Sequence, residues 1–172
     1  MARITALTDA QAPARSGELL NGVKAKFGKA PNMFRTLAHS PAALNGYLQF
    51  SGALAEGVLT AAEREIVALA VGQANQCGYC LSAHTLIGKG AGLSDDAVQS
   101  AREGKGSALA ALALKLVENR GFLDDDELAT ARGKGLSDAQ ILEVIAHVAL
   151  NTFTNYVNHV AGTDIDFPEV KV

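Results

Sequence analysis

Three short phrases of the same kind divide the sequence, and each is typical of one helix ending and the next beginning. In each phrase a glycine is followed by one or two apolar residues and then by a serine or threonine. Glycine tolerates the left-handed conformation that often ends a helix, and a serine or threonine side chain accepts a hydrogen bond from a free N–H at a helix start. The phrases predict helix starts after these three residues: Thr60, Ser94 and Ser137.

Apolar residues recur at helical spacing through the rest of the chain, and no segment shows a strand pattern. Pro31 and Pro41 each stand where the first residue of a helix tolerates proline. A chain of 172 residues is near the usual size of one domain, so we predict a single all-α domain of about eight helices. They are expected at roughly 13–27, 31–39, 41–56, 60–75, 78–90, 94–103, 107–120 and 137–160, with a short one near 124–132.

Charge and hydropathy exclude two classes of partner. Fifteen Lys and Arg against eighteen Asp and Glu give a net charge of −3, and no basic cluster suits nucleic acid. The longest uncharged run, 144–163, contains too many amide and imidazole groups to lie in a membrane. The N-terminus lacks the apolar segment of a secretory signal. We therefore expect a cytoplasmic protein that binds neither nucleic acid nor membranes.

Several acids and histidines have ordinary structural explanations. The acidic run 124–127 is typical of the first turn of a helix, where carboxylates bond free N–H groups, and we prefer the same kind of explanation for the acids in 164–168. No histidine among His39, His147 and His159 has a cysteine or second histidine at ligand spacing, so we expect surface or core roles for them.

The chemistry-bearing segment is Cys77-Gly-Tyr-Cys80-Leu-Ser-Ala-His84. On a helix, Cys77, Cys80 and His84 fall within an arc of about 60° and share one face. A cysteine in the first helical turn is favoured as a thiolate, and two cysteines at this spacing can close a reversible disulfide. The residues thus predict a redox dithiol in which peroxide forms a sulfenic acid on one cysteine and the other condenses with it, releasing water.

His84 and Glu65 are the candidate proton carriers. His84 lies one turn beyond Cys80, where it can take the thiol proton and protonate the departing oxygen. Glu65 can orient that imidazole, but in a simple helical hairpin it lies about 16 Å from the turn whereas His84 lies about 9 Å from it. Contact therefore requires long side chains, a bent helix or a bridging water.

The roles of the two cysteines differ by position. Cys80 is assigned the attack because a peroxidase needs a nearby acid as well as a favourable field, and His84 is closest to Cys80 along the helix. Cys77 remains an alternative attacking thiol because it is nearer the helix N-terminus.

Tyr79 is either a packing ring or a hydroxyl that lines the substrate pocket. Zinc bound by the cysteines, His84 and an acid is a competing interpretation, although no second pair of ligands follows.

The motif formed by Glu65, Cys77, Cys80 and His84 resembles the signature of the alkylhydroperoxidase AhpD-like proteins of the carboxymuconolactone decarboxylase superfamily. The Tyr-Cys-x-x-x-His form and the segment 31–41 look like its peroxidase-related branch, and the similarity runs from about residue 25 to the end. It implies a single AhpD-like helical domain over 1–172, with the cysteine core at about 45–120, assembled as a homotrimer or homohexamer.

The resemblance also implies peroxide reduction by Cys80 as the attacking thiol and Cys77 as the resolving thiol, with His84 and Glu65 as the proton relay. The reductant would be a dihydrolipoamide-like dithiol or a thioredoxin-like protein. The best-known members have a second relay histidine where this chain has Tyr79. No cofactor is expected, because the glycines of 88–92 lack the preceding strand of a nucleotide site. The alternatives are a lactone decarboxylase-like enzyme and a zinc-binding or redox-sensing helical oligomer without enzymatic activity.

Overall fold

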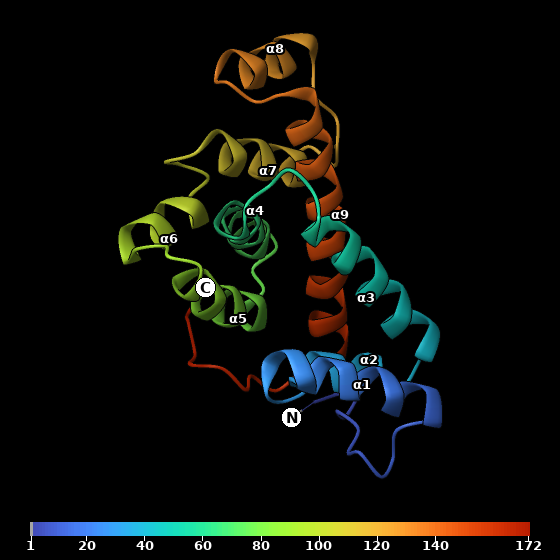
Figure 1. The fold of residues 1–172 in the computed structure, drawn as a ribbon. Coiled ribbons are helices and arrows are strands. Elements are labelled where there is room, and N and C mark those ends of the chain that lie inside the picture. The colour runs from blue at the N-terminus through green and yellow to red at the C-terminus, as the bar shows by residue number, and fades with distance from the viewer. Residues whose placement is uncertain (1) are drawn as a thin grey trace.

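The computed structural model describes residues 2–172, and every regular element in that range is a helix (Figure 1). The prediction of an all-α fold is confirmed, with nine helices in the described residues where about eight and a short one were expected. They are α1 (Ala14–Phe27), α2 (Asn32–Leu37), α3 (Pro41–Ala55), α4 (Ala61–Ala74), α5 (Gly78–Gly90), α6 (Asp95–Arg102), α7 (Ala108–Glu118), α8 (Asp125–Gly133) and α9 (Asp138–Ala161).

The predicted helix starts are confirmed by their capping hydrogen bonds. The side chains of Thr60, Ser94 and Ser137 each accept a backbone N–H three residues on. Asp124 does the same at the start of α8, so the acidic run does lie in a first helical turn. Pro41 is the first residue of α3, whereas Pro31 precedes α2 as its N-cap. These starts were predictable because the capping contacts are local in sequence.

Gly57 has a different role from the one its phrase predicts. Gly92 and Gly135 adopt a positive φ, but Gly57 does not. A Cβ at Gly57 would lie only 2.4 Å from a carboxylate oxygen of Glu143 on α9. That carboxylate accepts hydrogen bonds from the backbone N–H groups of Val58 and Leu59, at 2.7 and 3.0 Å. Glycine at this position therefore permits the close approach of α9 to the turn before α4.

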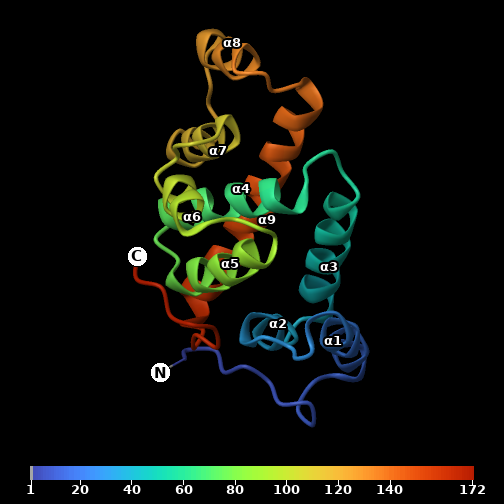
Figure 2. The same ribbon diagram turned by 60° about the vertical axis from the view of Figure 1, so that its left-hand side comes forward.

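Helix α4 lies at the centre of the fold. Six consecutive residues of α4, from Val67 to Gly72, are buried, and the helix packs against α5, α6, α7 and α9 (Figures 1 and 2). A helix that is apolar on all sides must be covered on all sides. Its neighbours provide this cover, and α5, which carries the two cysteines, is one of them.

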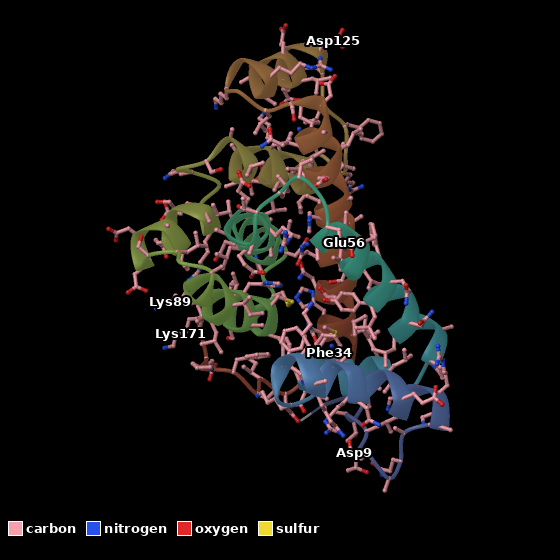
Figure 3. All side chains as sticks on the ribbon, in the orientation of Figure 1. Asp9, Phe34, Glu56, Lys89, Asp125 and Lys171 are labelled. Atoms are coloured by element: carbon pink, nitrogen blue, oxygen red, sulfur yellow. A yellow bond between two sulfur atoms is a disulfide. The ribbon has the colours of Figure 1, made fainter. Side chains whose placement is uncertain are left out.

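Helices α1, α2 and α3 form an N-terminal layer, in which α1 and α2 lie across one end of the bundle and α3 runs along its side towards α4 (Figures 1 and 2). Phe34 of α2 lies between this layer and the rest of the molecule (Figure 3), and its ring packs edge-on against Tyr47 of α3 with centroids 5.6 Å apart. Cys77, Tyr79 and Cys80 are buried in the same apolar cluster as Phe34. The N-terminal layer therefore covers the start of the cysteine helix.

Helix α9 is 24 residues long and carries a stripe of buried polar side chains. The stripe consists of His147, Asn151, Thr154, Asn155 and Asn158. Asn155 is fully buried and accepts a hydrogen bond from Asn75 at 2.9 Å. Across residues 2–172, no helix combines the length and apolar character needed to cross a bilayer.

His147 is a core residue rather than a surface one, and in the described chain its Nε2 has no hydrogen-bond partner. Burial lowers its pKa below the usual value of 6.5, so the folded state holds the neutral imidazole. His39 and His159 are exposed, and His39 lies 2.9 Å from the carbonyl oxygen of Thr5.

We predict that the free energy of unfolding falls as the pH drops below about 6.5, by at most about 1.4 kcal/mol per pH unit from His147. The sign follows because the unfolded chain binds the proton at a higher pH than the folded chain does. Urea unfolding between pH 7.5 and 5 should show a shallower pH dependence in His147→Gln than in the wild type. Equal slopes in the two proteins would contradict the prediction.

Candidate functional site

A tight turn between α4 and α5 places the first cysteine. Gln76 has a φ of +55°, which is unusual for a residue other than glycine. The N–H of Gln76 donates to the carbonyl of Gln73 at 3.0 Å, and the N–H of Cys77 donates to the carbonyl of Gly72 at 2.8 Å. This pair of bonds is a Schellman motif, which closes the C-terminus of α4. The chain therefore reverses within a few residues and enters α5 directly at Cys77.

Cys77 and Cys80 form a disulfide across the first turn of α5, with their Cα atoms 5.3 Å apart. Cys77 is the N-cap of the helix, and its sulfur accepts a hydrogen bond from the backbone N–H of Cys80 at 3.3 Å. Both cysteines are almost fully buried. The pair therefore lies in a site with little water, at the positive end of a helix dipole.

Glu65 contacts His84 directly, with 2.7 Å between Glu65 Oε2 and His84 Nδ1. Glu65 lies farther from the turn than His84 does, as expected from the sequence, because a Cβ at Gly88 would lie 3.5 Å from the Cβ of Glu65. Glu65 thus lies level with Gly88, and its side chain spans the one helical turn back to His84. The carboxylate fixes the imidazole with its proton on Nδ1, which leaves Nε2 for chemistry.

A cavity of about 320 Å³ opens beside Cys80 and His84. Cys80 lines it, whereas Cys77 does not. Its wall is mostly apolar and aromatic, formed by Phe27, Pro31, Met33, Phe34, Tyr47, Tyr79, Ala83, Leu86, Ile87, Phe167 and Pro168. The remaining lining residues, Lys29, Thr154, Asn158 and Asp166, are polar. Such a cavity suits a small, largely apolar molecule whose reacting atom meets the Cys80 sulfur.

Both interpretations of Tyr79 apply in part, because its ring lines the cavity while its hydroxyl is engaged elsewhere. The hydroxyl donates to Asp166 at 2.8 Å and accepts from the N–H of Met33 at 3.1 Å, and the ring packs edge-on against Phe167. Burial, together with the neighbouring Asp166 carboxylate, raises the pKa of Tyr79 far above its usual value of 10. Its hydroxyl is therefore a poor proton donor for the cysteines.

The C-terminal tail closes one side of the site. Asp166 also pairs with Lys29 at 3.1 Å and accepts from the first backbone N–H of α2, at Asn32. Farther along, the N–H of Val170 donates to the hydroxyl of Ser82 on α5 at 2.9 Å. The tail therefore ties α2 to α5. Asp166 does not lie in the first turn of a helix, contrary to the explanation preferred from the sequence, but its carboxylate accepts the first N–H of the distant helix α2.

The structure brings together Cys77, Cys80, His84, Glu65 and Tyr79, and it adds residues that sequence reasoning missed. Asn158 of α9 donates from Nδ2 to the sulfur of Cys80 at 3.3 Å. Asp166 and Lys29 also lie at the cavity. Within residues 2–172, no group of three or more His, Cys, Asp or Glu side chains is arranged to hold a metal ion. The sequence signal for Asn158 was its place in the polar stripe of α9.

Comparison with known proteins agrees with the motif. Residues 41–119, which include the whole Glu65–His84 segment, match the model of the Carboxymuconolactone decarboxylase family. No curated protein matches the chain.

Solved structures of similar fold cover nearly the whole chain. An uncharacterized peroxidase-related protein with an alkylhydroperoxidase AhpD core, from Ralstonia eutropha, superposes with a TM-score of 0.85 at 24% identity over 96% of this chain and 92% of its own. An uncharacterized peroxidase-related protein from Silicibacter sp. superposes with a TM-score of 0.78 at 21% identity, over 94% of this chain and 92% of its own. The debrominase Bmp8, as a variant in complex with 2,3,4-tribromopyrrole, superposes with a TM-score of 0.79 at 20% identity, over 95% of this chain and 91% of its own. At these identities the likeness establishes an AhpD-like fold.

We predict that Tyr79→Phe lowers the free energy of unfolding by about 1 kcal/mol, because two hydrogen bonds are lost while the ring packing stays. The rate at which peroxide oxidises the dithiol should stay within about twofold of wild type, since the hydroxyl is already bonded to Asp166. Chemical denaturation and stopped-flow oxidation measure the two effects. A loss of rate without a loss of stability would instead place the Tyr79 hydroxyl in proton transfer.

Proposed function

We propose that this chain, whose residues 41–119 match the carboxymuconolactone decarboxylase family and whose fold is AhpD-like, is a thiol-dependent peroxidase. The observation that carries the proposal is the cavity, which reaches the sulfur of Cys80 beside a histidine that is held by a carboxylate. The residues match a reaction that needs one accessible thiolate, one resolving thiol and one proton carrier.

In the proposed reaction Nε2 of His84 first takes the thiol proton of Cys80, and the resulting thiolate attacks the outer oxygen of a hydroperoxide. The O–O bond breaks, Cys80 becomes a sulfenic acid, and His84 gives a proton to the departing alkoxide from Nε2, which makes an alcohol. Cys77 then attacks the sulfur of Cys80, the S–O bond breaks, and water leaves as the disulfide forms. Glu65 stabilises His84 while the imidazole is charged.

The attack is assigned to Cys80 because it lines the cavity and Cys77 does not. Cys77 has the stronger link to the helix N-terminus, since its sulfur accepts the Cys80 N–H. That position suits a resolving thiol, which must be deprotonated but does not need to meet substrate. A dithiol such as dihydrolipoamide, or a thioredoxin-like protein, is the proposed source of two electrons for the next cycle. We place this chemistry in the cytoplasm, where such reductants are kept reduced.

A second candidate is reductive dehalogenation of a small haloaromatic compound. Its support is the aromatic wall of the cavity and the similarity in fold to a debrominase with a bound tribromopyrrole. Both reactions would take two electrons from the same cysteine pair. The product separates them: an alcohol from an organic hydroperoxide, or bromide from 2,3,4-tribromopyrrole, each measured with dithiol in excess.

We also propose a homotrimer or homohexamer. The outward face of α9 carries exposed apolar side chains at Leu142, Ile145, Tyr156 and Val160. Monomers rarely leave such a continuous apolar face in water. Sedimentation equilibrium at micromolar concentration should give a mass three or six times that of the chain, and Val160→Glu should lower the mass. A monomer at that concentration in the wild type would contradict the proposal.

The peroxidase proposal predicts that cumene hydroperoxide is consumed with dihydrolipoamide present, and that Cys80→Ser abolishes turnover. His84→Gln should lower kcat/KM by about a hundredfold, because general acid–base groups contribute about 10² to 10⁴. His159→Gln, which changes an exposed histidine outside the cavity, is the matched control. Thiol titration and metal analysis accompany the assay. Full turnover in Cys80→Ser, or two free thiols with one zinc per chain after peroxide treatment, would overturn the proposal.

A further inference from the structure

Asn158 is buried on α9 and touches the reacting sulfur. Its side chain lines the same cavity as Cys80 and His84, and its Nδ2 lies 3.3 Å from the sulfur of Cys80. The contact joins residues 78 positions apart in the sequence. It is set by the packing of α9 against α5. The amide is therefore held at the sulfur before any substrate arrives.

The direction of the hydrogen bond follows from chemistry. A disulfide sulfur carries lone pairs and no proton, so only the NH₂ group of the amide can bond to it. The opposite amide orientation would place Oδ1 against the sulfur lone pairs. In the described chain Oδ1 is buried and has no partner, so no second contact competes for the orientation of the side chain. Asn158 therefore presents a donor to Cys80.

A donor to sulfur matters most when the sulfur is charged. A hydrogen bond to the ionised form of a group favours that form and lowers the pKa of a thiol. The bond is stronger when little water competes for it, and Asn158 is only 5% exposed and Cys80 only 3%. Reduction of the disulfide leaves this donor beside the Cys80 thiolate.

The other ionisable groups that face the cavity are engaged with each other. His84 of α5 is paired with Glu65 of α4, and Lys29 ahead of α2 is paired with Asp166 of the tail. Tyr79 bonds Asp166 as well. Tyr47 of α3 also lines the cavity, and burial raises its pKa to about 12, so it stays neutral. Helix α9 itself contributes only the neutral side chains of Thr154 and Asn158 to the cavity.

We propose that Asn158 is a catalytic residue that donates its amide hydrogen to the Cys80 thiolate and thereby keeps that thiol reactive at neutral pH. The inference rests on the proposed function for its role in turnover, but the lowered pKa of Cys80 stands apart from any substrate.

The test is the pKa of Cys80, measured in Cys77→Ser so that a single thiol titrates, by the ultraviolet absorbance of the thiolate. Asn158→Ala should raise this pKa by about one unit, which lowers the thiolate fraction about tenfold at a pH below the pKa. Asn158→Leu keeps the side-chain volume and serves as a second variant without the donor. Asn155→Ala is the matched control, because Asn155 is equally buried on α9 but bonds Asn75 and not sulfur.

A second readout is the rate of oxidation by peroxide as a function of pH. The Asn158 variants should be slow near neutral pH and approach the wild-type rate above their raised pKa, whereas a merely structural defect lowers the rate at every pH. An unchanged pKa of Cys80 in the Asn158 variants, or an equal rise in Asn155→Ala, would overturn the inference. If the pKa of Cys80 depends on the Asn158 amide but the protein consumes no peroxide, the inference about Asn158 stands and the peroxidase proposal is wrong.

Discussion

The site depends on the turn that joins α4 to α5. Because Gln76 takes the left-handed conformation and Cys77 bonds back to Gly72, the chain reverses without a loop and Cys77 becomes the cap of the next helix. The same turn fixes the register of the two helices. Glu65 then lies level with Gly88, from where its carboxylate reaches one turn back to His84. One local backbone geometry thus sets both the cysteine pair and the contact between Glu65 and His84.

The rest of the fold surrounds this hairpin from three directions. The N-terminal layer contributes the aromatic wall around Phe34, the tail contributes Asp166, and α9 contributes Asn158. Each contribution is made through buried or partly buried hydrogen bonds or ring contacts, and such contacts are stronger where water is excluded. The result is a mostly apolar and aromatic cavity that is also lined by Cys80, His84, Asn158 and Asp166.

Local features of this molecule were predictable from its sequence, and long-range ones were not. The caps at Thr60 and Ser137, and the shared face of Cys77, Cys80 and His84, depend on residues within one or two turns. For Glu65 and His84 the sequence predicted only how far each residue lies from the turn along its own helix. Whether the two side chains touch depends on how closely the two helices pack, which the sequence does not give. The contacts of Asp166 and Asn158 join segments more than 75 residues apart. For Asn158 the sequence offered only the run of polar residues on α9 as a signal.

In the proposed reaction Cys80 attacks the peroxide, and Cys77 then attacks the sulfenic acid formed on Cys80. This division of roles can be tested. It is tested most directly by giving one equivalent of hydroperoxide to each reduced single-cysteine protein, trapping sulfenic acid with a dimedone-type reagent and locating it by mass spectrometry. The account predicts rapid trapping on Cys80 in Cys77→Ser and slow reaction in Cys80→Ser. Rapid sulfenic acid formation on Cys77 in Cys80→Ser, with little on Cys80 in the other variant, would contradict it.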